Sequence, residues 1–236
     1  MITSELSLKI GNVELKQHNT PTSTLLEHIA DALYNGTNLA ALSKIVLVDS
    51  AGAEKDYTTN LTFTVGDTLK IEGTISVTAS YTVAYIRTYA GTNKYFESSV
   101  NFSVAGGDQV QITITISLTA SGSLTGATFN LVNLKTMLFK VLANQLDKSQ
   151  LNIQYVVFNI TNLVDNTTAD YQVTPSKSKP SANQVSLTGS YTPAFDWALN
   201  AVKVKAVGGD LYSYTTNITG YMNTQITYND TITVST

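Results

Sequence analysis

The chain has 236 residues, a formal net charge of −3 and no cysteine. Hydrophobic residues make up 43%, as in a folded protein, whereas charged residues make up only 13%, about half of the usual share. No basic stripe is present to neutralise phosphates, and this argues against a nucleic-acid partner. The absence of cysteine excludes disulfides, thiolate nucleophiles and zinc–thiolate sites.

Uncharged Thr, Ser, Asn and Tyr are expected to supply most of the polar surface. Low charge weakens the repulsion between neighbouring copies, which suits dense assembly. Residues 1–14 lack the long apolar core of a signal peptide, and no run approaches the roughly 18 apolar residues of a membrane span. The sequence therefore predicts no membrane-spanning segment.

The first part of the chain predicts a strand, a helix and then a series of strands. A strand is expected over 6–15, and a helix over 25–33 because its apolar residues recur at helical spacing until Asn35-Gly36 ends it. The apolar run 45–48 predicts a buried strand. Alternating Thr, Val, Ile and Tyr predict further strands at 61–65, 68–76, 81–89, 95–104 and 109–119.

The same order of elements recurs after residues 121–123. A second helix is expected over 136–146 and a second apolar strand over 155–158. Each apolar strand is followed by an Asp-Tyr pair, at Asp56-Tyr57 and Asp170-Tyr171. Each half then has a strand that ends in a glycine turn. Each also ends in an alternating strand, which is 109–119 in the first half and 225–234 in the second.

This recurrence predicts a mainly β fold with two tandem β-sandwich, jelly-roll-like domains, residues 1–121 and 122–236. They would be related by internal duplication, and each would carry a short helix near its start. The alternative is that any two Thr/Val-rich sandwiches resemble one another. The spacing leaves open whether the topology is jelly-roll or immunoglobulin-like.

We find no pattern that predicts catalysis or metal binding. His18 and His28 lack a second ligand at metal-binding spacing and are expected at the surface. The acidic groups Asp49/Glu54/Asp56 and Asp165/Asp170 are expected in solvated loops, the second as a turn that bonds its own backbone rather than as a calcium site. The sequence therefore predicts no catalytic residue, no cofactor and no metal, and a protein that is not an enzyme.

Two further sets of residues carry predictions about surfaces. Lys177-Ser178-Lys179 lies in a Pro/Ser-rich stretch and predicts a solvated loop, and Trp197 is expected at a core edge. Tyrosines suit subunit interfaces and sugar-stacking platforms, although they also serve as ordinary packing on strands. They gather in the strand-rich parts as Tyr81, Tyr85, Tyr89, Tyr95, Tyr191, Tyr212, Tyr214 and Tyr221.

The helix Leu25 to Gly36, the polar break after it and the apolar strand within Leu39 to Val48 resemble modules of phage and archaeal-virus structural proteins. With a duplicated sandwich, the chain resembles turret, vertex, decoration or fibre-base proteins. Turret proteins of icosahedral viruses from hot acidic springs, built from tandem jelly rolls, are the particular comparison. The resemblance covers nearly the whole chain but is one of architecture and composition. The low charge departs from the charge-rich composition of hyperthermophile proteins.

The resemblance implies a non-enzymatic virion structural protein that is exposed on the particle surface. Its expected partners are further copies of itself, as a homo-oligomer, and other virion structural proteins. The alternative is a carbohydrate-binding or adhesin module that attaches to host-surface glycans through exposed tyrosines. Neither function requires a nucleic-acid partner.

Overall fold

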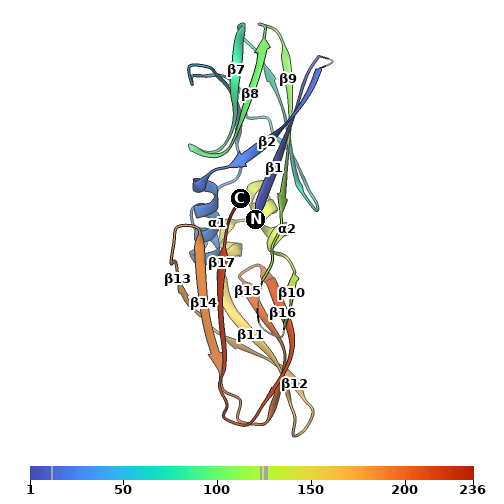
Figure 1. Ribbon diagram of the computed structural model, residues 1–236, viewed down its shortest axis with the longest axis vertical. Helices are drawn as coiled ribbons and strands as arrows, with labels where there is room; N and C mark the ends of the chain where they lie inside the picture. Colours follow the sequence, from blue (N-terminus) through green and yellow to red (C-terminus); the bar gives the residue numbers. More distant parts are fainter. Residues whose placement is uncertain (12, 123, 125–126) are drawn as a thin grey trace.

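The computed structural model describes residues 1–11, 13–122, 124 and 127–236. It is mainly β, with 58% of the chain in strands, which confirms the predicted fold class at this level. Within the described residues there are two α-helices, α1 (Ser23–Asn35) and α2 (Leu134–Leu142), and a short 3-10 helix, η1 (Lys148–Leu151). Figure 1 shows an elongated molecule in which the N-terminal and C-terminal halves lie end to end with the helices between them.

The first half forms a curled antiparallel sheet with the strand order β4-β3-β7-β8-β2-β1-β9-β6-β5 among the described residues. The sheet curls at β2, which pairs with β1 along most of its length and with β8 only at Thr20 and Pro21. The predicted strand over 6–15 is instead a hairpin that turns at Gly11, where φ is 56°. The strands are β1 (Ile2–Ile10), β2 (Val13–Pro21), β3 (Lys44–Asp49), β4 (Glu54–Thr58), β5 (Thr62–Val65), β6 (Leu69–Ser76), β7 (Tyr81–Ala90), β8 (Asn93–Val104) and β9 (Gln109–Leu118).

The second half forms two sheets among the described residues, ordered β10-β16-β15-β11-β12 and β13-β14-β17. These orders repeat β2-β8-β7-β3-β4 and β5-β6-β9 of the first half, strand for strand. The halves differ at β1, which joins β2 to β9, whereas no described strand of the second half pairs with both β10 and β17. The strands are β10 (Ala127–Leu131), β11 (Ile153–Asn162), β12 (Thr168–Val173), β13 (Ser176–Ser178), β14 (Gln184–Tyr191), β15 (Trp197–Ala206), β16 (Gly209–Gly220) and β17 (Ile226–Thr233).

Helix α1 forms where the sequence predicts it, because its ends are capped. The Thr22 hydroxyl accepts the Leu25 N–H at 3.4 Å, and Gly36 ends the helix with φ at 76°. Its buried face packs against β8 of its own half and against β11, β14 and η1 of the other. The second predicted helix is shorter than expected, since α2 ends at Leu142 and Asn144 has a positive φ of 57°.

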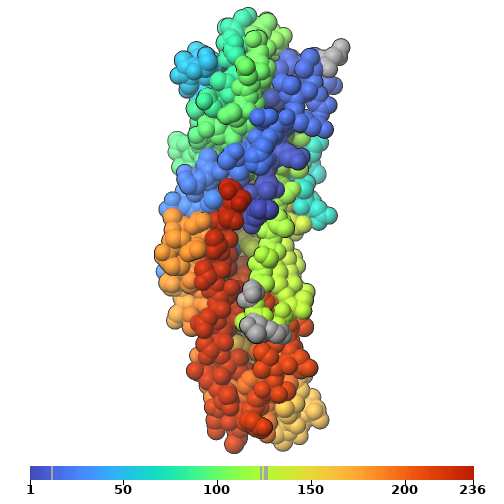
Figure 2. All heavy atoms as spheres, viewed as in Figure 1, coloured from blue at the N-terminus to red at the C-terminus, as the bar shows by residue number. Residues whose placement is uncertain are grey.

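One continuous hydrophobic core runs through both halves and includes residues of α1 and α2. The ends of the described chain also meet at the middle, where the Ile2 N–H donates to the Ser235 carbonyl at 2.7 Å. Figure 2 shows the red C-terminal residues against the dark blue N-terminal ones. The two halves are therefore packed against each other over a shared apolar interior.

The prediction that Lys177-Ser178-Lys179 is a solvated loop is wrong, because Ser176–Ser178 form strand β13 and the two lysines bind helix α1. Lys177 Nζ donates to the carbonyl of Tyr34, to Asn152 Oδ1 at 2.9 Å and to the Ile153 carbonyl at 2.9 Å. Lys179 pairs with Asp31 of α1. The carbonyls of the last helical turn have no partners within the helix and attract cations. We call Lys177 and Lys179 the lysine clamp.

Candidate functional site

The acidic residues after β3 are not a solvated loop, because β4 begins at Glu54 and its alternation turns Asp56 inward. Asp56 is 5% exposed and accepts the hydroxyls of Thr78 at 2.7 Å and Tyr81 at 2.9 Å. Burial and this carboxylate hold the pKa of Tyr81 well above the usual value. Asp49 caps its turn by accepting the backbone N–H groups of Ala51 and Ala53. These carboxylates stabilise the β3–β4 region.

The outer surface of β3, β4 and β7 carries an aromatic and cationic layer, which we call the tyrosine face. It lies over Val46 and Val48, which are buried although they lie outside the main core. Lys44 Nζ lies 5.7 Å from the ring centroid of Tyr57 and 4.7 Å from that of Tyr89, and the Arg87 guanidinium lies 5.6 Å from that of Tyr85. The tyrosine face consists of Lys44, Tyr57, Tyr85, Arg87 and Tyr89.

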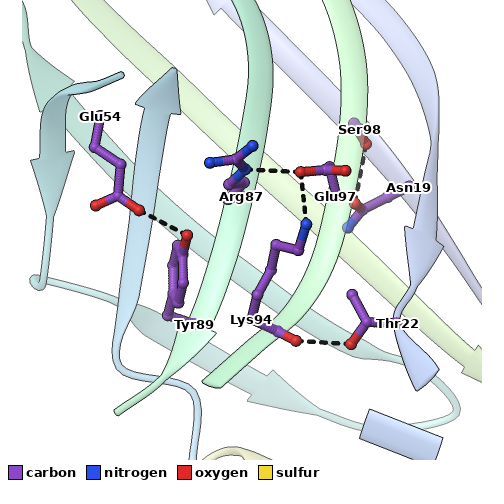
Figure 3. Close-up of polar contacts among 8 residues, drawn as sticks. All are labelled: Asn19, Thr22, Glu54, Arg87, Tyr89, Lys94, Glu97 and Ser98. Carbon is purple, nitrogen blue, oxygen red and sulfur yellow. Dashed lines mark hydrogen bonds and ion pairs between the residues drawn. The ribbon is translucent and has the colours of Figure 1, made fainter. Parts of the chain in front are cut away.

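Figure 3 shows how charges beside the tyrosine face are paired. Tyr89 donates its hydroxyl to Glu54 at 2.6 Å, while Glu97 binds Arg87 at 2.7 Å and Lys94 at 2.8 Å. The hydrogen bond from Tyr89 and the ion pair with Lys44 hold the pKa of Glu54 below its usual value. Burial alone would raise the pKa of Glu97, but Lys94 and Arg87 outweigh it and lower that pKa. Neither carboxyl is tuned to act as a general acid near neutral pH.

A buried polar chain lies next to this network, at the point where the sheet curls. Ser98 of β8 donates to Asn19 Oδ1 of β2 at 2.9 Å, as Figure 3 shows. Asn19 in turn donates to Ser4 Oγ of β1 at 3.1 Å. The chain links three neighbouring strands and satisfies each buried polar group.

The second half has a different polar cluster, the tyrosine–aspartate lock. Asp230 Oδ2 of β17 accepts the hydroxyls of Tyr212 at 2.8 Å and Tyr214 at 3.3 Å, both from β16, and that of Tyr228 at 2.7 Å. Burial and the nearby Asp230 carboxylate hold the pKa of each phenol well above the usual value. The lock therefore connects the two sheets of the second half through side chains.

A cavity of about 590 Å³ lies beside the lock, between the halves. Apolar side chains of α1, α2 and β10, including Leu33, Leu138 and Phe129, form much of its wall. Tyr212, Tyr214 and Asp230 add polar atoms at one end, but those atoms already bind one another. Among the described residues, no fully buried side-chain nitrogen or oxygen lacks a hydrogen-bond partner.

Other residues singled out in the sequence serve local structure. His18 is exposed as predicted, whereas His28 is half-buried on α1 and its Nδ1 lies 2.8 Å from the Tyr95 hydroxyl. Asp165 Oδ1 accepts the Thr167 N–H at 2.9 Å, which confirms the predicted self-bonded turn. Asp170 lies on strand β12, not in a loop, and pairs with Lys203 at 3.0 Å.

Across residues 1–11, 13–122, 124 and 127–236, no group of three or more His, Asp and Glu side chains is arranged to hold a metal ion. Over the same described stretches, neither α-helix has the length and apolar character needed to cross a bilayer. No protein-family model matches the chain. No curated protein and no solved structure is significantly similar to it.

Proposed function

We propose that this chain is a non-enzymatic structural protein exposed on the surface of a virus particle. In this function it acts as a stiff spacer that contacts further copies of itself and other particle proteins. The observation that carries the proposal is the way in which the two halves are joined. Two β units that are fixed to each other keep the two ends of the molecule at a constant separation, as a spacer requires.

The junction is rigid because several contacts hold it. The core is continuous through the junction, and the lysine clamp binds the end of α1 from the other half. The Leu42 N–H also donates to the Leu142 carbonyl at 2.9 Å, which ties the α1–β3 connection to the end of α2. Domains that share a large apolar interface do not move independently, unlike domains joined by a small polar one.

The outer surface also favours close packing of copies. Its net charge is only −3, and salt bridges pair the carboxylates of Glu54, Glu97 and Asp170 with basic side chains. Low surface potential reduces repulsion between neighbours in a dense shell.

We further propose that the two halves, 1–121 and 122–236, arose by duplication of one β-sandwich unit. The repeated strand order supports this, because eight strands and one helix of each half recur in sequence among the described residues. The jelly-roll-like character of each unit remains a prediction.

Electron microscopy of particles from the source of this chain tests the proposal. Antibody raised against the folded chain should label the outside of intact particles, and the purified chain should form oligomers in light scattering. Particles that contain the chain but bind antibody only after disruption would contradict the exposed position. A strictly monomeric chain that is absent from particles would refute the structural role.

A carbohydrate-binding function is the second candidate, and the exposure of Tyr57 favours it. This ring is 63% exposed at the edge of the tyrosine face, beside the Lys44 ammonium, and is able to stack on a sugar. Tyr85 and Tyr89 of the same face are only half-exposed. If the chain binds a glycan array, Tyr57→Ala should abolish binding and Tyr155→Ala, an exposed tyrosine of the other half, should not. Equal binding by both variants would reject this site.

A further inference from the structure

Large apolar side chains gather at the free end of the second half. They come from the β11–β12 loop, residues 163–167, and from the β16–β17 loop, residues 221–225. The side chains are Leu163, Val164, Tyr221 and Met222, which are 45%, 77%, 79% and 56% exposed. Figure 1 places these loops at the lower end of the long axis, far from the junction of the halves. We call these four residues the apolar tip.

The loops of the apolar tip are held by hydrogen bonds to the β14–β15 loop. The Asp196 carbonyl accepts the Leu163 N–H at 2.8 Å, and Asp196 Oδ1 accepts the Met222 N–H at 2.8 Å. The Val164 N–H donates to Asn162 Oδ1 at 2.9 Å. A backbone N–H that already has a partner loses little on entering a medium without water. Three of the four apolar side chains, Leu163, Val164 and Met222, are thus presented from residues whose N–H groups already have acceptors.

The matching end of the first half shows that the fold does not require these side chains. The corresponding loops are residues 50–53, 77–80 and 105–108, at the upper end in Figure 1. Their exposed residues are Ser, Ala, Gly and Thr. In these three corresponding loops the first half therefore exposes small residues, whereas the second half exposes large apolar ones. Large apolar side chains that are exposed together on neighbouring loops mark a site of interaction.

We propose that the apolar tip inserts into the interfacial region of a neutral lipid bilayer, such as one of phosphatidylcholine. The three loops at this pole contain no lysine or arginine, and Asp165 and Asp196 are exposed beside the patch. These carboxylates would repel an anionic membrane, and they would oppose each other if two tips met. A neutral bilayer requires no opposite charge. Tyrosine also favours the lipid–water interface, where its hydroxyl stays hydrated.

The depth of insertion follows from the same residues. Asp165 adjoins Val164 in sequence, and a carboxylate is costly to carry into hydrocarbon. The apolar side chains therefore reach the boundary of the acyl chains while the carboxylates stay among the headgroups. Binding by one tip is weak, and display of many tips on one assembly strengthens it through multivalency.

The chain has a single tryptophan, which reports directly on the tip. Trp197 Nε1 donates to the Tyr221 carbonyl at 3.1 Å, so the indole lies directly behind the apolar tip. With phosphatidylcholine vesicles, the intact chain should float with the lipid. Bromine atoms placed near the headgroup end of the acyl chains should quench Trp197 fluorescence. Admixture of phosphatidylserine should weaken binding.

A pair of matched double variants tests whether lipid binding depends on the apolar tip or on exposed apolar side chains in general. Val164→Ser with Tyr221→Ser should lower the partition coefficient roughly tenfold or more, because binding scales with the apolar area buried. Val13→Ser with Tyr155→Ser makes the same changes at residues that are 59% and 40% exposed elsewhere, and should leave binding unchanged. An unchanged thermal midpoint in both variants shows that they fold.

Several outcomes would overturn the proposal. An intact chain that leaves neutral vesicles untouched would assign the apolar tip to a protein partner instead. Equal losses in both double variants would remove any special role of the tip. Stronger binding to phosphatidylserine than to phosphatidylcholine would point to an electrostatic contact elsewhere on the molecule.

Discussion

The two halves contain the same order of strands but close their β units by different means. In the first half, β1 lies between β2 and β9 and pairs with both, so a backbone ladder connects the two parts of the sheet. In the second half, no such strand pairs with β10 and β17 among the described residues, and the tyrosine–aspartate lock connects the sheets. Backbone pairing depends little on any one side chain. The lock depends on one carboxylate.

The largest effect is expected from removing that carboxylate. Asp230→Ala should lower the free energy of unfolding by about 3 kcal/mol, because the buried hydroxyls of Tyr212, Tyr214 and Tyr228 lose their shared acceptor. Chemical denaturation followed by Trp197 fluorescence measures the loss. Ser98→Ala in the first half is the matched control and should cost about 1 kcal/mol, since the β1 ladder remains. Equal losses would show that both halves depend on side chains to the same extent.

Much of the local structure is predictable because it depends on neighbours in sequence. The alternation of Val110, Ile112, Ile114 and Ile116 predicts β9 and its buried face. The capping threonine and Gly36 delimit α1 in the same way. The pairing of strands is not local, so periodicity alone could not reveal that β1 closes the first half. Nor could it reveal that the two Asp-Tyr pairs face opposite ways on their strands, so that Asp56 is buried whereas Asp170 is exposed.

The polar clusters were less predictable, since their partners lie far apart in the chain. Lys177 and Tyr34 are separated by 143 residues, and a lysine in a Ser/Pro-rich stretch is usually solvated. The spacing of Tyr228 and Asp230 by two residues does place both on one face of a strand. That signal was present in the sequence, but it could not name Tyr212 and Tyr214 as partners.

A smaller effect is expected at the junction of the halves. Lys177→Met keeps the aliphatic stem but leaves the carbonyls of Tyr34 and Ile153 without their donor, which should cost about 2 kcal/mol. The lower thermal midpoint should be accompanied by faster proteolytic cleavage between the halves. Lys16→Met, at an exposed position of β2, should change neither measurement. A junction that resists protease as well in Lys177→Met as in the intact chain would assign its rigidity to the apolar core alone.

The smallest effect concerns two ion pairs that both cross the junction but differ in exposure. Burial alone would raise the pKa of Asp31, but hydrogen bonds from Asn38 and Lys179 outweigh it and hold that pKa below the usual value. A depressed carboxyl pKa stabilises the fold above the pKa of the unfolded chain, about 4, and this stabilisation is lost as pH falls through the lower folded value. Asp31→Asn should therefore cost about 1 kcal/mol at pH 7 and almost nothing below about pH 3.

Asp67 and Lys135 form the exposed counterpart, with 3.3 Å between their charged atoms and Asp67 fully open to water. Asp67→Asn should leave the free energy of unfolding unchanged at either pH, because water and salt screen an exposed pair. Urea unfolding of both variants at pH 7 and pH 3 measures the difference. If Asp31→Asn behaves like Asp67→Asn, the clamp at α1 is no more than a surface contact. If only Asp31→Asn depends on pH, burial at the junction is what gives this ion pair its strength.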